Sequence, residues 1–240
     1  MPNHVTTIIR IHCPEDRLEE IKAAHWVDGE NGPRFCFKTL IPRPEALDIT
    51  SDHQLTTLAK GGRSILDEYA NTPDSIIEIR SRTEERSLTP ERAKELEKMR
   101  ANIKVYGQPT WYEWSIENWG TKWNAYNCSL DGNRLQFDTA WSHPVPIMRE
   151  LFRRYQDVLF DVQYADEDAG SNLGKYTSPD VQPYQKEQGE LVPRLVGIAY
   201  KILGRDFEEL MRENLEDGDS WMTKDQWHEA HKAYKEHSLP

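Results

Sequence analysis

Alternating apolar and polar positions at the start of the chain predict a β-strand over residues 5–12. Pro14 suits the first turn of a helix, and Leu18 and Ile21 follow it at helical spacing. The alternation returns over residues 35–39 and stops at a proline-rich stretch, which is typical of a second strand. The opening of the chain therefore predicts a β-α-β unit.

Residues 45–108 depart from this pattern, and we expect them to form a helical insertion. Residues 55–69 have helical periodicity that is broken at Gly61-Gly62. A second helix is predicted over residues 90–102, because Thr89 can cap it and a proline occupies its first position. The many charges of both signs in this helix indicate a solvated surface with paired side chains.

The segment of residues 111–123 holds four of the eight tryptophans of the chain. Thr110 and Glu113 form a capping box that begins a helix, and Gly120 is placed to end it. One aromatic face of this helix can pack on a sheet, and a second face, with Trp111, needs another partner. Because buried indoles contribute large packing energy, a core helix is the simpler interpretation and an aromatic pocket is the alternative.

A β-hairpin is predicted next, because Asp131-Gly132 is typical of a two-residue turn. This turn pairs Cys128 with Leu135, so that apolar residues meet on one face. A helix over residues 145–155 and an alternating strand over residues 160–164 follow. Together with the opening strands, these elements predict an antiparallel or mixed sheet covered by helices, of the α+β class.

One face of the predicted sheet points away from these helices. By the predicted register it carries the following residues: Ile8, Arg10, His12, Cys36, Lys38, Trp123, Gln136 and Asp138. Proteins that bind RNA on such a face use several aromatic residues there, and this face offers one. Binding of nucleic acid by this face is therefore disfavoured.

The acidic residues are concentrated near the end of the chain. Residues 161–240 carry 17 Asp and Glu against 9 Lys and Arg, while the whole chain has a net charge of −11. This balance disfavours a general phosphate-binding surface. We expect a domain over residues 1–190, with its insertion at about residues 45–108, and an acidic helical extension over residues 191–240.

The cysteines give no sign of a disulfide framework or a metal site. Cys13, Cys36 and Cys128 lie far apart, are odd in number and form no CxxC pair. The beginning of the chain has no basic region followed by an apolar run, and no stretch approaches the ~20 apolar residues of a membrane span. We therefore expect a cytoplasmic protein with no metal and no cofactor.

Two segments have tryptophan, glycine and proline residues in a distinctive order. They read Trp114-x-x-x-Asn118-Trp119-Gly120-Thr121-Lys122-Trp123-x-Ala125-Tyr126 and Phe137-x-Thr139-Ala140-Trp141-Ser142-x-Pro144. Over most of residues 1–175 the chain resembles the YubB-type ferredoxin-like domain of uncharacterised phage and plasmid proteins. The resemblance implies a ferredoxin-like fold and a mobile-element origin, and it implies no activity.

Three functional hypotheses stay open. The chain shows no GxSxG, HExxH or phosphate-binding glycine loop, which disfavours an enzyme, although such a search misses sites assembled from distant residues. The leading hypothesis is a non-enzymatic accessory protein that binds a macromolecular partner, such as a host protein, for example as a host-directed or counter-defence factor. The second is a small-ligand protein or enzyme, and the third is single-stranded nucleic-acid binding by stacking. The candidate binding residues are Trp111, Trp114, Asn118, Lys122 and Trp123.

Overall fold

The computed structural model describes most of the chain. The described residues are 3–29, 32–62, 73–168, 172–181, 193–216 and 222–239. The chain divides into two compact units: unit 1 comprises Met1–Ile41 and Trp119–Pro240, and unit 2 comprises Pro42–Asn118. The domain boundary expected at residues 190 and 191 falls outside the described residues. Across those ranges, no helix combines the length and the apolar character that crossing a membrane requires.

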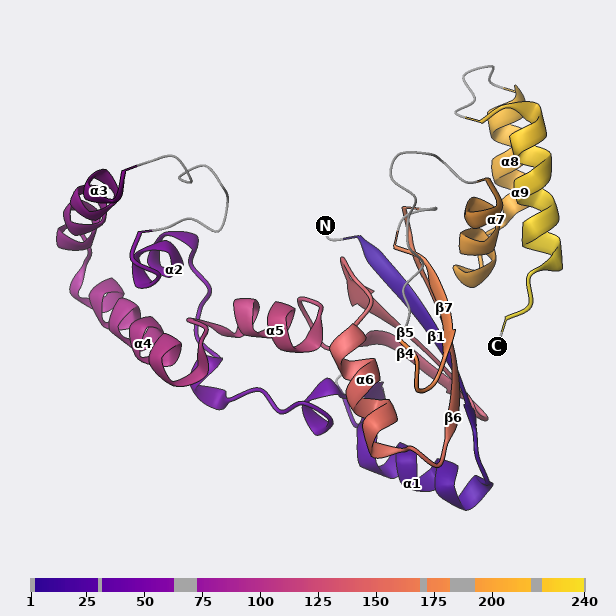
Figure 1. Cartoon of the computed structure of the whole chain (residues 1–240), viewed down its shortest axis with the longest axis horizontal. Coiled ribbons are helices and arrows are strands. Elements are labelled where there is room, and N and C mark those ends of the chain that lie inside the picture. Colours follow the sequence, from indigo (N-terminus) through magenta and orange to yellow (C-terminus); the bar gives the residue numbers. More distant parts are fainter. Residues whose placement is uncertain are drawn as a thin grey trace. The chain divides into compact units, whose positions relative to one another are not determined.

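Unit 1 is built on a five-stranded antiparallel sheet in the order β4-β5-β1-β6-β7 (Figure 1). The strands are β1 (His4–His12), β4 (Tyr126–Asp131), β5 (Arg134–Ala140), β6 (Leu159–Asp166) and β7 (Gly174–Thr177). The central strand β1 pairs with β5 on one side and with β6 on the other. Because β1 is central, its residues are buried on both faces, as at Ile8 and Ile9.

Helices α1 (Glu15–His25) and α6 (Val145–Arg154) lie on one side of this sheet (Figure 1). The apolar positions of α6 recur at helical spacing, and the helix buries Ile147, Met148, Leu151 and Phe152. Phe152 stacks on Phe160 of β6, with 5.2 Å between the ring centroids. The predicted first helix and the predicted helix after the hairpin are therefore confirmed.

The other side of the sheet is covered by α7 (Pro193–Ile202), with α8 (Phe207–Glu216) and α9 (Lys224–Glu236) in the same helical group (Figure 1). Ile198, Ala199 and Ile202 of α7 pack with Ile8 and Ala165 of the sheet. The prediction that Ile8 lies on an open face was wrong. Apolar residues of the sheet on this side are covered by the apolar side of α7, which removes them from water.

The prediction of a second strand over residues 35–39 was also wrong. Residues 34–35 form β3 (Arg34–Phe35), which pairs only with β2 (Trp26–Val27) in a separate small sheet. A short 3₁₀ helix, η1 (Phe37–Thr39), follows at once. The Phe37 amide donates to Asn124 Oδ1 at 2.8 Å and the Thr39 hydroxyl donates to the Cys36 carbonyl at 2.7 Å. These tertiary and local bonds replace the ladder that the alternation predicted.

The hairpin of β4 and β5 is confirmed, but its predicted register is wrong by two residues. Leu135 pairs with Leu130 instead of Cys128, so Gly132 and Asn133 form the turn. Gly132 has a φ of +55°, which suits the first central position of a type II′ turn. Near the turn this shift of two leaves the side chains on their predicted faces, whereas an irregularity between Tyr126 and Ser129 changes the register again and pairs Tyr126 with Asp138.

The segment after β6 contains the edge strand β7. Residues 174–177 alternate buried and exposed positions, and Tyr176 is buried. Gly174 pairs with Tyr164, and a Cβ atom at Gly174 would lie 2.2 Å from the Tyr164 ring. The glycine therefore lets the edge strand approach a buried tyrosine closely.

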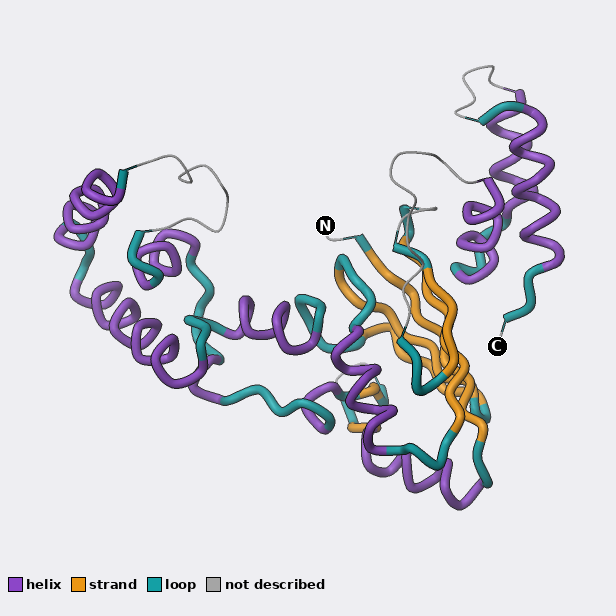
Figure 2. Tube along the Cα trace, in the orientation of Figure 1, coloured by secondary structure: helices purple, strands orange, loops and turns teal. Residues whose placement is uncertain are grey.

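The regular secondary structure of unit 2, across its described residues, is helical, and loops join the helices (Figure 2). It contains the 3₁₀ helix η2 (Glu45–Leu47) and the helices α2 (His53–Ala59), α3 (Asp74–Arg86), α4 (Pro90–Tyr106) and most of α5 (Trp111–Trp119). Leu55 and Leu58 of α2 pack with Leu96 and Met99 of α4. Thr89 caps α4, as predicted, whereas α3 was not predicted.

Candidate functional site: an exposed tryptophan surface

The five predicted binding residues divide between the two units. Trp111, Trp114 and Asn118 belong to unit 2, and Lys122 and Trp123 belong to unit 1. Two cavities in the described chain, of about 640 and 340 Å³, are lined by none of the five. We therefore consider the two groups separately.

The unit 2 group is engaged in local packing and hydrogen bonding. Trp114 is buried, with 7% of its surface exposed, and its carbonyl accepts a 2.9 Å hydrogen bond from the Asn118 side-chain amide. The guanidinium carbon of Arg43 lies 5.8 Å from the centre of the Trp111 ring. Thr110 donates to the Glu113 carboxylate at 2.6 Å at the start of α5. These contacts stabilise the helix and engage the polar groups of this segment within unit 2.

The unit 1 group forms a cation–aromatic cluster that we call the tryptophan clamp: Lys122, Trp123 and Trp141. The Lys122 ammonium lies 4.5 Å from the centre of the Trp123 ring and 4.8 Å from that of Trp141. Both indoles are well exposed, at 39% for Trp123 and 42% for Trp141. In contrast, Trp119 and Trp227 are almost fully buried. Two exposed indoles around one cation are therefore unusual within this molecule.

Short polar side chains join the two chain segments that carry the clamp. The Thr121 hydroxyl donates to the Ala140 carbonyl at 2.8 Å, and the Ser142 hydroxyl donates to the Gly120 carbonyl. Thr139 donates to the Ser142 carbonyl at 2.9 Å, which closes the turn around Trp141. The small and hydroxylated residues of the tryptophan motif thus hold the segment before β4 beside the segment after β5.

Gly120 allows this junction to form. Its φ is +76°, and a Cβ atom there would lie 2.8 Å from Pro146 Cδ. Any other residue would meet both backbone strain and a proline ring, so glycine is required at this position.

Trp141 has an uncommon backbone conformation for a bulky residue, with a φ of +69°. The structure holds it from both sides, because its amide donates to the Asn3 carbonyl at 2.9 Å and its carbonyl accepts from Asn172 at 3.0 Å. Such strain costs on the order of 1–2 kcal/mol and is common at functional sites. The indole is only partly buried, with 42% of its surface exposed, so its burial offsets this cost less than full burial would.

Tyr126 and several carboxylates lie close to the clamp. Tyr126 contacts the Trp123 ring edge to face, and its hydroxyl lies 2.6 Å from His4 Nδ1. Burial, followed by the negative charges of Asp138 and Glu167, raises the pKa of Tyr126 to about 12. The aromatic surface therefore has an acidic margin.

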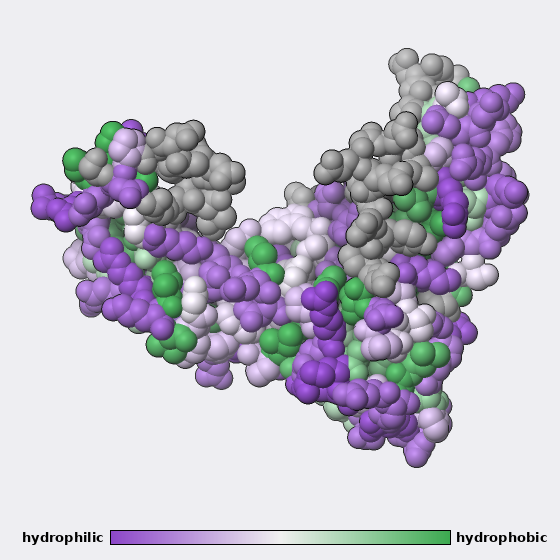
Figure 3. Space-filling model, in the orientation of Figure 1, coloured by the Kyte–Doolittle hydropathy of each residue, from purple (hydrophilic) through white to green (hydrophobic). Residues whose placement is uncertain are grey.

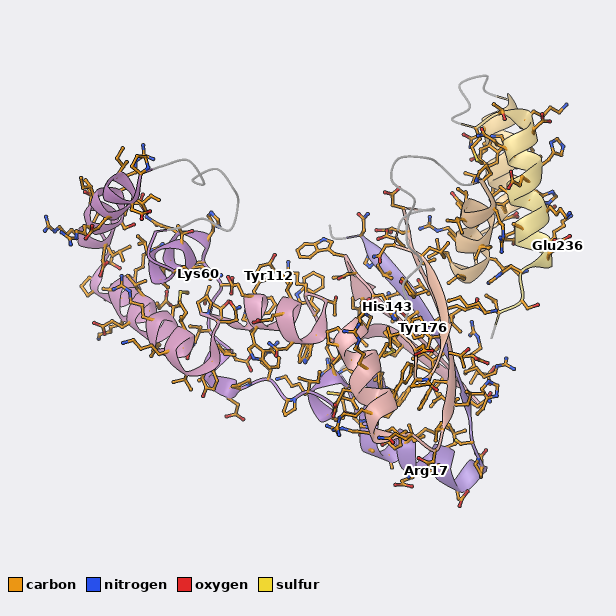
Figure 4. The ribbon with its side chains drawn as sticks, in the orientation of Figure 1. Arg17, Lys60, Tyr112, His143, Tyr176 and Glu236 are labelled. Atoms are coloured by element: carbon orange, nitrogen blue, oxygen red, sulfur yellow. The ribbon has the colours of Figure 1, made fainter. Side chains whose placement is uncertain are left out.

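Behind the Trp141 turn lies a buried histidine, His143, which Figure 4 shows next to Tyr176. Its Nδ1 is 2.9 Å from the Thr7 hydroxyl, its Nε2 is 2.5 Å from the Tyr176 hydroxyl, and its ring stacks on Tyr164. Burial lowers the pKa of His143 to about 3. The imidazole is neutral at physiological pH and fixes the turn to the sheet.

The clamp has the chemistry of a binding surface. Indole faces bind cations and planar groups, and the ring of Trp141 is held on a fixed backbone. Among the described residues, no group of three or more metal-binding side chains forms a metal site.

Sequence reasoning missed Trp141 as a site residue, although it is part of the motif. The available signal was the hairpin itself: extending the Tyr126–Asp138 pair by three residues on each strand reaches Trp123 and Trp141. His143 and Tyr176 were missed because their partners are distant in the sequence. No local pattern reports those contacts.

The sheet of unit 1, with helices on both sides, defines a ferredoxin-like domain of the α+β class. Residues 118–189 match a family model described as the ferredoxin-like domain in Api92-like protein. No curated protein matches the chain. A crystal structure of the protein Api92 from Yersinia pseudotuberculosis is similar, with 10% sequence identity, a TM-score of 0.37 and coverage of 79% of this chain and 100% of that one.

Proposed function

We propose that the chain is a non-enzymatic accessory protein that binds a macromolecular partner through the tryptophan clamp. The observation that carries this proposal is the pair of exposed indoles around Lys122, one of them on strained backbone. Tryptophan is enriched among the residues that dominate protein–protein affinity. An exposed, rigidly held indole loses little conformational freedom on binding.

The charge of the protein favours a basic partner. The chain has a net charge of −11, and Asp138 and Glu167 lie close enough to Tyr126 to affect its pKa. The visible faces of α8 and α9 are mainly hydrophilic (Figure 3). An arginine of a partner could stack on an indole while neighbouring carboxylates attract its charge.

The cellular setting is part of the same proposal. We assign the protein to a phage or plasmid lineage, on the resemblance of its tryptophan motif, and to a host-directed or counter-defence role. We place it in the cytoplasm, which its three free cysteines support. The partner would then be a host or mobile-element protein.

The test compares partners recovered by the intact chain and by the variants Trp123→Ala and Trp141→Ala from host lysate at about 0.15 M salt. Tyr106→Ala is the matched control, because Tyr106 is also exposed, at 37%, and lies in unit 2. We expect a protein that the parent and the Tyr106 variant retain and that both tryptophan variants lose. No specific partner, or equal recovery by all variants, would refute the proposal.

The same surface favours a second candidate, single-stranded nucleic-acid binding. Bases could stack on Trp123 and Trp141 while Lys122 meets a phosphate. The acidic margin opposes this candidate, since phosphate contacts need clustered cations. Filter binding of oligonucleotides at low salt tests it: retention by the parent and loss in Trp123→Ala would support it, and no retention would exclude it.

A further inference from the structure

A cavity of about 640 Å³ lies in unit 1, away from the residues of the tryptophan clamp. It is formed by α6, the turn between α6 and β6, and the segment after β7. Its described lining residues are Arg149, Phe152, Arg153, Tyr155, Gln156, Asp157, Val158, Leu159, Ser178 and Pro179. The volume falls in the range of small-molecule sites, about 300–1,000 Å³.

The floor of this cavity is apolar. Phe152, Tyr155 and Val158 are each buried, with less than a tenth of their surface exposed, and Leu159 is 47% exposed. The Tyr155 hydroxyl is engaged with His25 Nε2 at 2.8 Å, and the guanidinium carbon of Arg17 lies 5.1 Å from the centre of the Tyr155 ring. A ligand would therefore bury an apolar body here.

The polar part of the lining carries an excess of positive charge. Asp157 is neutralised by two 3.0 Å hydrogen bonds from Arg17, and Arg153 donates two hydrogen bonds to Glu150, at 2.7 and 2.8 Å. Arg149, one turn before Arg153 on α6, makes no hydrogen bond or ion pair within the described part of the chain. A guanidinium suits carboxylate and phosphate oxygens, which it can bind with two parallel bonds.

We propose that this cavity binds a small anion with an apolar body, in which a carboxylate or phosphate head group pairs with Arg149 and the body covers Phe152 and Val158. The site is separate from the clamp, so its function would be additional to partner binding. An exposed arginine with no hydrogen bond or ion pair among the described residues, beside a buried apolar floor, is the juxtaposition that supports it.

The test is isothermal titration calorimetry of the full chain with three matched probes: 4-phenylbutyrate, 4-phenylbutyl phosphate and 4-phenylbutanol. We expect at least one acid to bind more tightly than the alcohol, and the tighter acid identifies the head group. Arg149→Gln should weaken binding of that acid by about tenfold and leave the alcohol unchanged. Arg80→Gln is the control, because it removes the same charge from the exposed face of α3.

Leu159→Glu provides a second variant, because Leu159 is half exposed and a carboxylate there would repel the probe. We expect it to abolish binding of the acid. The proposal is overturned if neither acid binds at about 5 mM, if the alcohol binds as tightly as the acids, or if Arg149→Gln and Arg80→Gln have equal effects. The variant Trp123→Ala should bind the acid normally, which separates this site from partner binding.

Discussion

Unit 1 contains two buried neutral histidines, and their protonation should make its stability depend on pH. His143 lies between Thr7 and Tyr176, and His25 lies between Thr39 and Tyr155. Burial lowers the pKa of His25 to about 4 and that of His143 to about 3, from 6.5 for a free side chain. Replacing either histidine with glutamine removes its titration.

The direction of the effect follows from proton binding. Below pH 6.5 the unfolded chain protonates both histidines while the folded chain keeps them neutral, so acid favours unfolding. Between about pH 7.5 and 5, each histidine should lower the free energy of unfolding by about 2 kcal/mol, and the two together by about 4 kcal/mol. His237, whose pKa is also lowered mainly by burial, adds a smaller amount in every variant.

The assay is hydrogen–deuterium exchange of β1 peptides in increasing urea, at about pH 7.5 and 5. β1 belongs to unit 1, so unit 2 does not contribute to the signal. His143→Gln and His25→Gln should each lower stability at both pH values and also halve the difference between them. His228→Gln, at an exposed position of α9, should retain the full difference. A parent whose stability is equal at both pH values, or a His143 variant with an unchanged difference, would refute the reasoning.

Three further predictions concern stability and can be checked by urea unfolding. Trp141→Gly should change the free energy of unfolding by no more than about 1 kcal/mol, because relief of the positive φ offsets the lost contacts. Trp119→Ala, at a buried position, should cost about 3–5 kcal/mol. Equal losses would contradict the assignment of Trp141 to the surface. Gly197→Ala should cost more than about 2 kcal/mol, since its Cβ would lie 1.9 Å from the Ala230 carbonyl oxygen. At Gly204 an added Cβ meets no atom within 4 Å, so Gly204→Ala should cost about 1 kcal/mol from its φ of +65° alone. The reverse order of losses would show that α7 and α9 do not cross closely at Gly197. Thr223→Ala should cost about 1 kcal/mol by removing the cap of α9, and no loss would mean that this cap is dispensable.

The parts of the fold with local signals were predictable. Thr89 caps the helix that it was expected to cap, and Gly120 ends the tryptophan helix. The hairpin turn was misplaced because Asp131-Gly132 and Gly132-Asn133 are both good turn pairs. Alternation cannot separate two registers that differ by two residues.

Elements that depend on distant partners were not predictable. The strand expected at residues 35–39 is diverted by the bond between the Phe37 amide and Asn124, which lies far along the chain. The sheet face around Ile8 is covered by α7, and the sequence does not say on which face a terminal helix packs. Local periodicity indicates which residues face the core, but it does not identify the distant residues against which they pack.

The candidate site was predictable in part for the same reason. Lys122 and Trp123 were selected together with Trp111 and Trp114, because all the tryptophans of the motif have similar local surroundings. Trp114 packs inside unit 2, whereas Trp123 is exposed beside Trp141. Burial of an indole depends on the tertiary structure, so residue type alone could not separate the two groups.

The central claim is that the exposed indoles of the clamp carry partner binding. Its most direct test is the affinity of the purified partner, identified by the recovery experiment, for the parent and for the double variant Trp123→Ala/Trp141→Ala. We predict a loss of affinity of about a hundredfold or more, with the unfolding midpoint nearly unchanged. Equal affinity of the parent and the double variant would contradict the account.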